Sequence, residues 1–85
     1  MNVTFIGSGN LAWHLAPALD NTGYAVREVY SPHRKNAEAL AQRLYNAIVL
    51  PKLDFSRSAS RIFIIAVADD AIPEVVDELV FPDDA

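Results

Sequence analysis

The chain has 85 residues and a hydrophobic content of 52%, which fits one folded domain over residues 1–85 and excludes a disordered chain. It contains no cysteine, so disulfides, thiolate zinc sites and thiol catalysis are excluded. The net charge of −4 disfavours nucleic acid as a partner, because phosphate contacts need a basic surface. No apolar run approaches the roughly 20 residues of a membrane span. The start, MNVTFIGSG, lacks the basic region of a signal peptide, so we expect a cytoplasmic protein that does not bind membranes.

Strand and helix patterns alternate along the chain. β-Branched and aromatic runs predict four strands, over residues 2–6, 25–30, 47–50 and 62–67. Apolar residues at helical spacing predict three helices, over residues 10–21, 36–45 and 72–79. Gly23 is placed to end the first helix, and Pro17 should bend that helix without breaking it. A single helical turn is expected near residues 54–56.

This alternation predicts an α/β fold in which a parallel sheet carries helices on both faces. The fourth strand, within RIFIIAVA, is the most apolar run and shows no polar alternation. Such a pattern is typical of a central strand that is buried on both faces. The strand order should be 3-2-1-4, which is a truncated form of the usual six-stranded sheet, so a further C-terminal domain is expected to be missing.

The segment between the first strand and the first helix has the pattern G-x-G-x-x-A, from Gly7 to Ala12. In that position it is the fingerprint of a dinucleotide-binding turn. Gly7 permits the tight turn, Gly9 lets the backbone approach a pyrophosphate, and Ala12 allows the helix to pack close to the sheet. The free N–H groups at the start of the helix favour the phosphates. A plain glycine-rich connection is the alternative interpretation.

Three stretches, GSGNLAWHLAPAL, EVYSPHRKNAEALA and IFIIAVADDAI, together resemble the Rossmann-type NADP-binding domain of a reductase group. This group includes pyrroline-5-carboxylate reductase and the coenzyme F420-dependent NADP reductases. The resemblance covers nearly the whole chain and is strongest to a branch with a second, helical C-terminal domain. It implies hydride transfer to a small imine or carbonyl substrate, with the substrate pocket and a homodimer interface supplied by the C-terminal domain.

The end of the second strand distinguishes NADP from NAD. NAD-binding domains place an acid there, whereas NADP-binding domains omit it and supply a cation for the 2′-phosphate. The strand ends at Ser31 without an acid, and His33, Arg34 and Lys35 follow. We therefore predict NADP as the cofactor. Glu28 is the competing candidate for an NAD ribose contact, but it lies in mid-strand.

One position departs from the resembling pattern, which has arginine directly after the serine. This chain has Pro32 there, so the contact with the 2′-phosphate would move to the following residues. Arg34 and Lys35 could instead only solvate the second helix. The full predicted cofactor site comprises Gly7, Ser8, Gly9, Asn10, Leu11, Ser31, His33, Arg34, Lys35, Ala66, Val67 and Ala68.

No residue is a convincing catalytic acid or base, and no metal site is predicted. Asp70 is better interpreted as the N-cap of the last helix than as a catalytic carboxylate paired with Asp69. His14 is interpreted as a packing or hydrogen-bonded histidine and Trp13 as a packing residue, not as catalytic groups. Two functions remain open: the cofactor-binding domain of an NADP-dependent oxidoreductase, and a non-catalytic nucleotide-sensing or interaction module.

Overall fold

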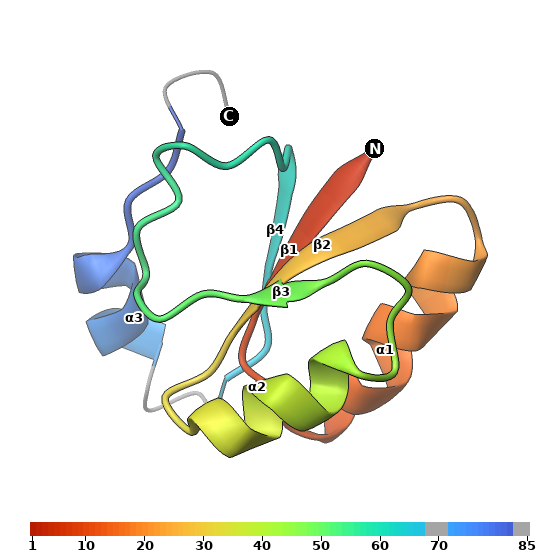
Figure 1. Cartoon of the computed structure of the whole chain (residues 1–85). Coiled ribbons are helices and arrows are strands. Elements are labelled where there is room, and N and C mark those ends of the chain that lie inside the picture. Colours follow the sequence, from red (N-terminus) through yellow and green to blue (C-terminus); the bar gives the residue numbers. More distant parts are fainter. Residues whose placement is uncertain (68–71, 83–85) are drawn as a thin grey trace.

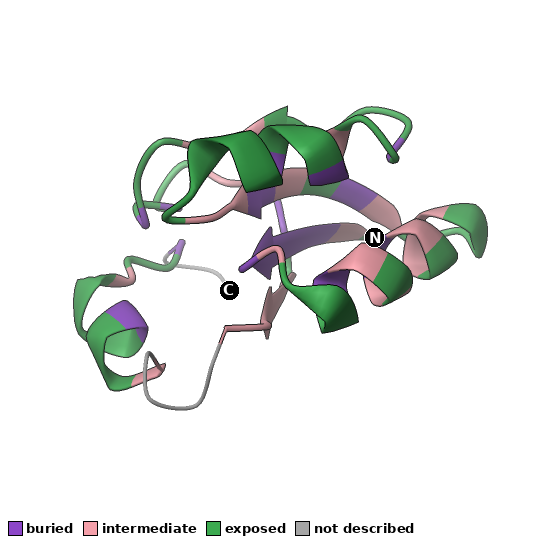
Figure 2. Cartoon of the chain, turned by 90° about the horizontal axis from the view of Figure 1, so that it is seen from below, coloured by how far each residue is buried: buried purple, intermediate pink, exposed green. Residues whose placement is uncertain are grey.

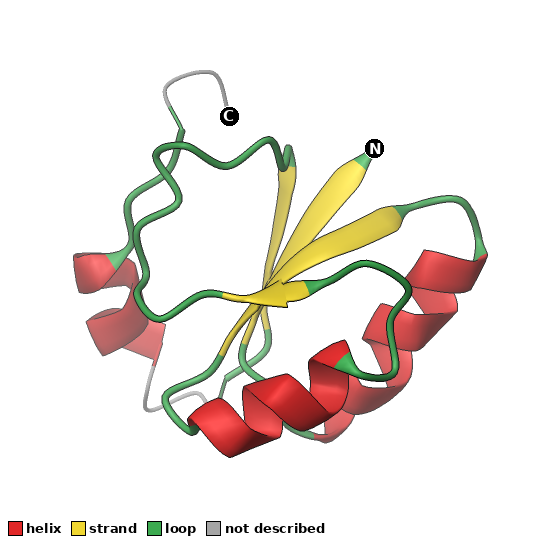
Figure 3. Ribbon diagram, viewed as in Figure 1, coloured by secondary structure: helices red, strands yellow, loops and turns green. Residues whose placement is uncertain are grey.

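A computed structural model describes residues 1–67 and 72–82 of the chain (Figure 1). Strands and helices alternate in the predicted order, as the colouring of Figure 3 shows. The elements are β1 (Asn2–Ile6), α1 (Asn10–Asn21), β2 (Ala25–Tyr30), α2 (Arg34–Ala41), β3 (Ile48–Val49), β4 (Ile62–Ile65) and α3 (Ile72–Glu78). Within the described ranges, no helix is long and apolar enough to cross a membrane.

The four strands form one parallel sheet in the order β3-β2-β1-β4, which confirms the predicted fold class and strand order. β1 lies between β2 and β4. After β1, the chain therefore adds β2 and β3 on one side of β1 and later adds β4 on the other side of β1. Ligands of such sheets bind at this reversal, beyond the carboxyl ends of the strands.

Each face of the sheet carries its own apolar core. On one face, α1 and α2 cover Val3 and Phe5 of β1 through the buried side chains of Ala16 and Leu40. On the other face, α3 and the segment before β4 cover Ile6. Figure 1 shows α3 on the opposite side of the sheet from α1 and α2, and Figure 2 shows that the buried residues of the helices face inward. Helices on both faces are thus confirmed.

A bulge in β2 allows this strand to fit the sheet although its buried residues do not alternate regularly with exposed ones. Val26 and Val29 both belong to the core under α1 and α2, although residues three apart normally point to opposite faces of a strand. The register shifts between the pairs Val3–Val26 and Thr4–Glu28, so that Arg27 is passed over. The additional residue restores the alternation and leaves Arg27 exposed to solvent.

Helix α1 runs through Pro17 without a break and ends as predicted. Thr22 closes the helix by donating its N–H to the Leu19 carbonyl, and Gly23 follows with φ of +101°. The apolar spacing that continues beyond Pro17 keeps the helix on the sheet. Close to the start of α1, the guanidinium of Arg43 lies 4.4 Å from the ring centre of Trp13. This cation–π contact joins α1 to the turn after α2.

The second helix differs from the predicted range of 36–45. It starts two residues earlier because the His33 carbonyl accepts the N–H groups of Asn36 and Ala37, at 2.9 and 3.2 Å. It also ends earlier, because the N–H groups of Arg43 and Leu44 bond three residues back, in a tighter turn. The third strand contains only Ile48 and Val49 instead of residues 47–50.

The fourth strand is covered on both faces, as predicted, but only in part: Ile62 and Ile64 pack against the core under α1 and α2, and Phe63 and Ile65 pack against the core under α3. β4 is shorter than the predicted range, and each of its four residues is only half-buried. It lies at the edge of the sheet and, among the described residues, pairs with β1 alone. An apolar run therefore does not by itself identify a central strand.

The segment near residues 54–56 forms a turn instead of the expected helical turn. The Asp54 carboxylate accepts the Ser56 N–H at 3.0 Å, and Ser58 donates its N–H to the Phe55 carbonyl at 2.9 Å. Phe55 also donates its N–H to the Val80 carbonyl, which ties the turn to the residues after α3. Asp54 here makes the local bond that aspartate commonly makes in turns.

The turn at Asp54 should make stability depend on acid pH. The hydrogen bonds from Ser56, with a smaller contribution from Arg57 and Lys52, lower the pKa of Asp54 below its ordinary value of 3.8. A lowered pKa in the folded state stabilises the fold above the ordinary value, and this contribution is lost as the pH falls through the folded pKa. Asp54→Asn, which retains the oxygen acceptor, should therefore shrink the drop in urea midpoint between about pH 5 and pH 2. An identical drop in wild type and variant would assign the acid sensitivity to other carboxylates.

Candidate dinucleotide site

Gly7 is required by the fold itself. Its φ is +109°, a region that side-chain-bearing residues rarely adopt, and a Cβ there would collide with the backbone carbonyl of Ala66. The Gly7 N–H donates to the Tyr30 carbonyl at 2.7 Å, and the Ala66 N–H donates to the Ile6 carbonyl at 2.7 Å. The turn is therefore held between β2 and β4, at the carboxyl ends of the strands.

Gly9 is not required by the fold. Its backbone is extended, with φ of −74° and ψ of −167°, a conformation open to any residue. A Cβ at Gly9 would have no atom within 4 Å, and the residue is exposed. The missing side chain thus leaves free space directly over the start of α1, where a large group can approach the backbone.

The start of α1 offers its N–H groups to a ligand. Gly9 is the N-cap and supplies no side-chain hydrogen bond, and the first turn of α1 contains no acidic residue. Ala12 is fully buried against the sheet, which fits its predicted role as a small contact between helix and strands. The positive end of the helix dipole is therefore uncompensated at this point and suits an anion.

A short chain of hydrogen bonds connects this turn to the end of β2. The hydroxyl oxygens of Ser8 and Ser31 lie 3.0 Å apart, and the His33 N–H donates to the Ser31 hydroxyl at 3.2 Å. Ser8 and Ser31 are half-buried, whereas His33 is exposed. The two loops that the sequence assigns to the pyrophosphate and to the ribose 2′-position are thus held in contact.

These groups surround a cavity of about 330 Å³ at the carboxyl ends of β1, β2 and β4. This volume lies at the small end of the range for ligand sites. Seven of the predicted cofactor residues line it. The lining residues are Gly7, Ser8, Gly9, Ser31, Pro32, His33, Asn36, Ala66, Val67 and Val75.

Four predicted residues do not line this cavity in the described part of the chain. Asn10 and Leu11 belong to the exposed first turn of α1, and Lys35 is exposed on α2. Arg34 is also exposed, and its Nε lies 3.6 Å from a carboxylate oxygen of Glu38. Of the three predicted basic residues, His33 thus lines the cavity, whereas Arg34 and Lys35 do not. The predictions for Ala68, Asp69 and Asp70 lie outside the described residues.

Sequence reasoning missed Asn36 and Val75 and considered Pro32 only as a departure. Asn36 lies three residues after His33, so a helix that starts at residue 34 brings both to one side of α2. Predicting the helix start two residues too late concealed this relation. Val75, a buried residue of α3, reaches the cavity from the other face of the sheet. No pattern in the sequence around Val75 indicates a contact with the cofactor.

Glu28, the candidate contact for an NAD ribose, has another role. Its carboxylate accepts hydrogen bonds from the hydroxyls of Thr4, at 2.7 Å, and Ser58. Thr4 in turn shares a hydrogen bond of 2.7 Å with the hydroxyl of Ser60. Thr4 and Ser60 are buried, so this network fixes the segment before β4 to the middle of the sheet. Glu28 does not line the cavity at the strand ends.

Removing the Glu28 acceptor should destabilise the domain. Glu28→Ala would remove the acceptor that the hydroxyls of Thr4 and Ser58 share, leaving Thr4 only its bond with Ser60, and is expected to cost about 1–3 kcal/mol in the free energy of unfolding. Glu28→Gln retains an oxygen acceptor and should cost less. Urea unfolding of both variants measures the difference. Equal losses would show that the carboxylate charge matters and that the acceptor geometry does not.

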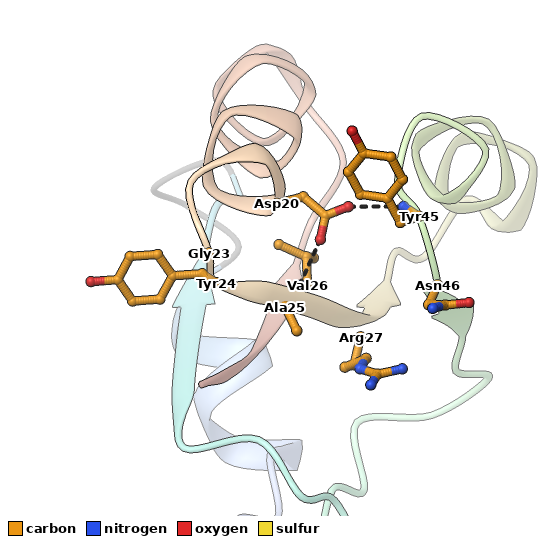
Figure 4. Close-up of a pocket in the computed structure, with 8 residues that line it drawn as sticks. All are labelled: Asp20, Gly23, Tyr24, Ala25, Val26, Arg27, Tyr45 and Asn46. Atoms are coloured by element: carbon orange, nitrogen blue, oxygen red, sulfur yellow. Dashed lines mark hydrogen bonds between the residues drawn. The ribbon is translucent and has the colours of Figure 1, made fainter.

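A second hollow, of about 260 Å³, lies at the opposite, amino ends of the strands (Figure 4). Asp20 in its wall accepts the N–H groups of Val26, at 3.1 Å, and Tyr45, at 2.8 Å. Its polar groups thus connect the end of α1 to β2 and to the turn after α2. His14 is exposed on α1, lines neither hollow and has no side-chain hydrogen bond to the described residues, so its predicted packing or hydrogen-bonding role is wrong, whereas the half-buried Trp13 packs as predicted.

The parallel sheet, the strand order and the glycine turn at the reversal define a Rossmann-like domain. Residues 2–85 match the model of the family NADP oxidoreductase, coenzyme F420-dependent. The chain therefore belongs to this family. A search of curated proteins gave no match.

Among solved structures, the chain is similar to one named "putative NADP oxidoreductase BF3122", from Bacteroides fragilis. The two are 28% identical in sequence, with a TM-score of 0.77. The match covers 92% of this chain and 30% of the other. The chain thus spans less than a third of the length of that protein.

Proposed function

We propose that this chain is the cofactor-binding domain of an NADP-dependent oxidoreductase and binds NADP ahead of NAD in the cavity at the carboxyl ends of the strands. The observation that carries the proposal is the free space at Gly9. The fold makes no demand for glycine there, yet a side chain would fill the approach to the helix N-terminus. Family membership independently supports a dinucleotide.

The residues around the cavity divide into two groups by what they would hold. The turn from Gly7 to Gly9 and the first N–H groups of α1 would hold the pyrophosphate. Ser31 and His33 would lie at the ribose, with the Ser8 hydroxyl bonded to Ser31. The described wall contains no carboxylate, which removes the acid typical of an NAD ribose contact.

The reaction is proposed from family resemblance. When bound, the nicotinamide supplies the hydride chemistry, so the domain itself needs no nucleophile. We propose a small imine or carbonyl as the substrate. We further propose that a helical C-terminal domain supplies the substrate pocket and a homodimer interface, in a cytoplasmic protein. The length of the solved neighbour, more than three times the matched part, is consistent with an additional domain.

A titration tests this proposal directly. The protein is titrated with NADPH and, separately, with NADH, while the fluorescence of the reduced nicotinamide is followed. Reduced nicotinamide mononucleotide, which lacks the adenosine half, serves as the control ligand. We expect tighter binding of NADPH than of NADH and no binding of the mononucleotide. Binding of neither dinucleotide would contradict the proposed function, and tighter binding of NADH would contradict the choice of cofactor.

A further inference from the structure

We propose that Asn36 determines the cofactor specificity of this site and that it does so as a neutral residue, so that the domain accepts both NADP and NAD. The proposal rests on the proposed function and deepens it. Three observations carry it: the make-up of the cavity wall, the position of the basic residues, and the chemistry of the amide.

The described wall of the cavity has no permanently charged side chain. At the ribose end, its polar groups are the hydroxyls of Ser8 and Ser31, the imidazole of His33 and the amide of Asn36. Pro32, which lies between Ser31 and His33, has no N–H and no polar side chain. A dianionic 2′-phosphate would therefore meet hydrogen-bond donors, but no fixed cation from the described wall.

The neighbouring cations lie outside this wall. Arg34 and Lys35 are exposed residues of α2 that do not line the cavity in the described part of the chain. Arg34 also lies within ion-pair distance of Glu38, one helical turn further along. Successive residues of a helix are about 100° apart around its axis, so a helix that places His33 and Asn36 on the cavity side turns the two residues between them away from it.

The amide of Asn36 can serve either ribose. Its NH₂ group donates hydrogen bonds to a phosphate oxygen, and its carbonyl oxygen accepts the hydrogen bond of a 2′-hydroxyl. Lysine or arginine at this position could only donate, and aspartate could only accept. The neutral residue therefore leaves a small preference for NADPH, set by the serine hydroxyls and the start of α2, and we expect a ratio of affinities for NADPH and NADH below about tenfold.

The test exchanges the charge at this one position. In Asn36→Lys, the ratio should rise about ten- to hundredfold above the wild type, the effect of one charge-assisted hydrogen bond. In Asn36→Asp, the ratio should fall and favour NADH. Ala39→Lys and Ala39→Asp introduce the same charges one helical turn further along α2, at an exposed residue that does not line the cavity, and serve as matched controls. Circular dichroism checks that all four variants fold.

The outcomes separate the two proposals. The role of Asn36 is supported if the wild type binds both dinucleotides with a small ratio of affinities. This ratio must then move in opposite directions in the two Asn36 variants and stay unchanged in the Ala39 variants. Binding with a ratio that the Asn36 variants leave unchanged, or that the Ala39 variants move equally, overturns this inference and leaves the proposed function standing. A wild-type ratio above about a hundredfold also overturns it. Binding of neither dinucleotide by the wild type overturns both proposals.

Discussion

Replacing Gly9 with valine should lower the affinity for NADPH about 100-fold, which corresponds to about 2.7 kcal/mol, while the fold is retained. The reason is that the fold tolerates a side chain at Gly9, whereas a bound pyrophosphate does not. The backbone of Gly9 is extended, and no atom lies within 4 Å of the position of a Cβ, so the folded protein has room for the side chain. The bound pyrophosphate would need the same room in order to reach the N–H groups of α1.

Two measurements check this expectation together. Fluorescence titration gives the affinity for NADPH, and urea unfolding gives the stability of the variant. We expect a stability loss below about 1 kcal/mol, since alanine and β-branched residues are poorer N-caps than glycine. Gly9→Ala should give an intermediate affinity because its side chain is smaller. Unchanged affinity in Gly9→Val would place the dinucleotide elsewhere, however stable the variant is.

Replacing Gly7 with alanine should instead disrupt the fold, with a loss of about 3 kcal/mol or more in the free energy of unfolding. Two costs combine here. The positive φ of +109° disfavours any residue with a Cβ, and that Cβ would press against the backbone carbonyl of Ala66, which directly follows β4 and cannot rotate away as a side chain could. A domain of this length has a total stability of roughly 4–13 kcal/mol, so the loss is a large share of it.

Gly23→Ala is the matched control for Gly7→Ala. Gly23 has a similar φ of +101°, but a Cβ there would have no atom within 4 Å. It should therefore lose only the conformational cost, about 1–2 kcal/mol. The difference between the two variants in urea unfolding measures the collision with β4. If both variants lost the same amount, the turn would be able to shift away from β4, and Gly7 would not be fixed by packing.

The sequence predicts the parts of this molecule that depend on local chemistry. The bounds of β1, α1 and β2 agree with prediction because a glycine lies at or near one or both ends of each element, and Ser31-Pro32 follows β2. The positive φ at Gly7 and Gly23 likewise follows from residue type and position. The alternation of strands and helices then leaves few possible topologies, and the observed order is the expected one.

The features that the sequence does not predict depend on contacts between distant segments. The apolar pattern of β4 does not reveal that the strand lies at an edge of the sheet, because burial depends on neighbours and not on the run itself. Arg34 and Lys35 follow β2, the strand that carries the ribose contact in dinucleotide-binding domains. Whether their side chains reach the cavity depends on the residue at which α2 begins. The bond between Glu28 and Ser58 joins residues 30 positions apart, and no local pattern indicates it.

The contact between Trp13 and Arg43 gives the domain an optical probe of its own. Trp13 is the only tryptophan in the chain, and it lies in α1, one helical turn after Gly9. Its emission should therefore respond to separation of α1 from the turn after α2, since that separation would move the guanidinium off the ring. Reduced nicotinamide absorbs light in the range where tryptophan emits. Quenching of this single emitter would thus report occupancy of the cavity, and a shift of its emission would report unfolding, in the same sample and without a label.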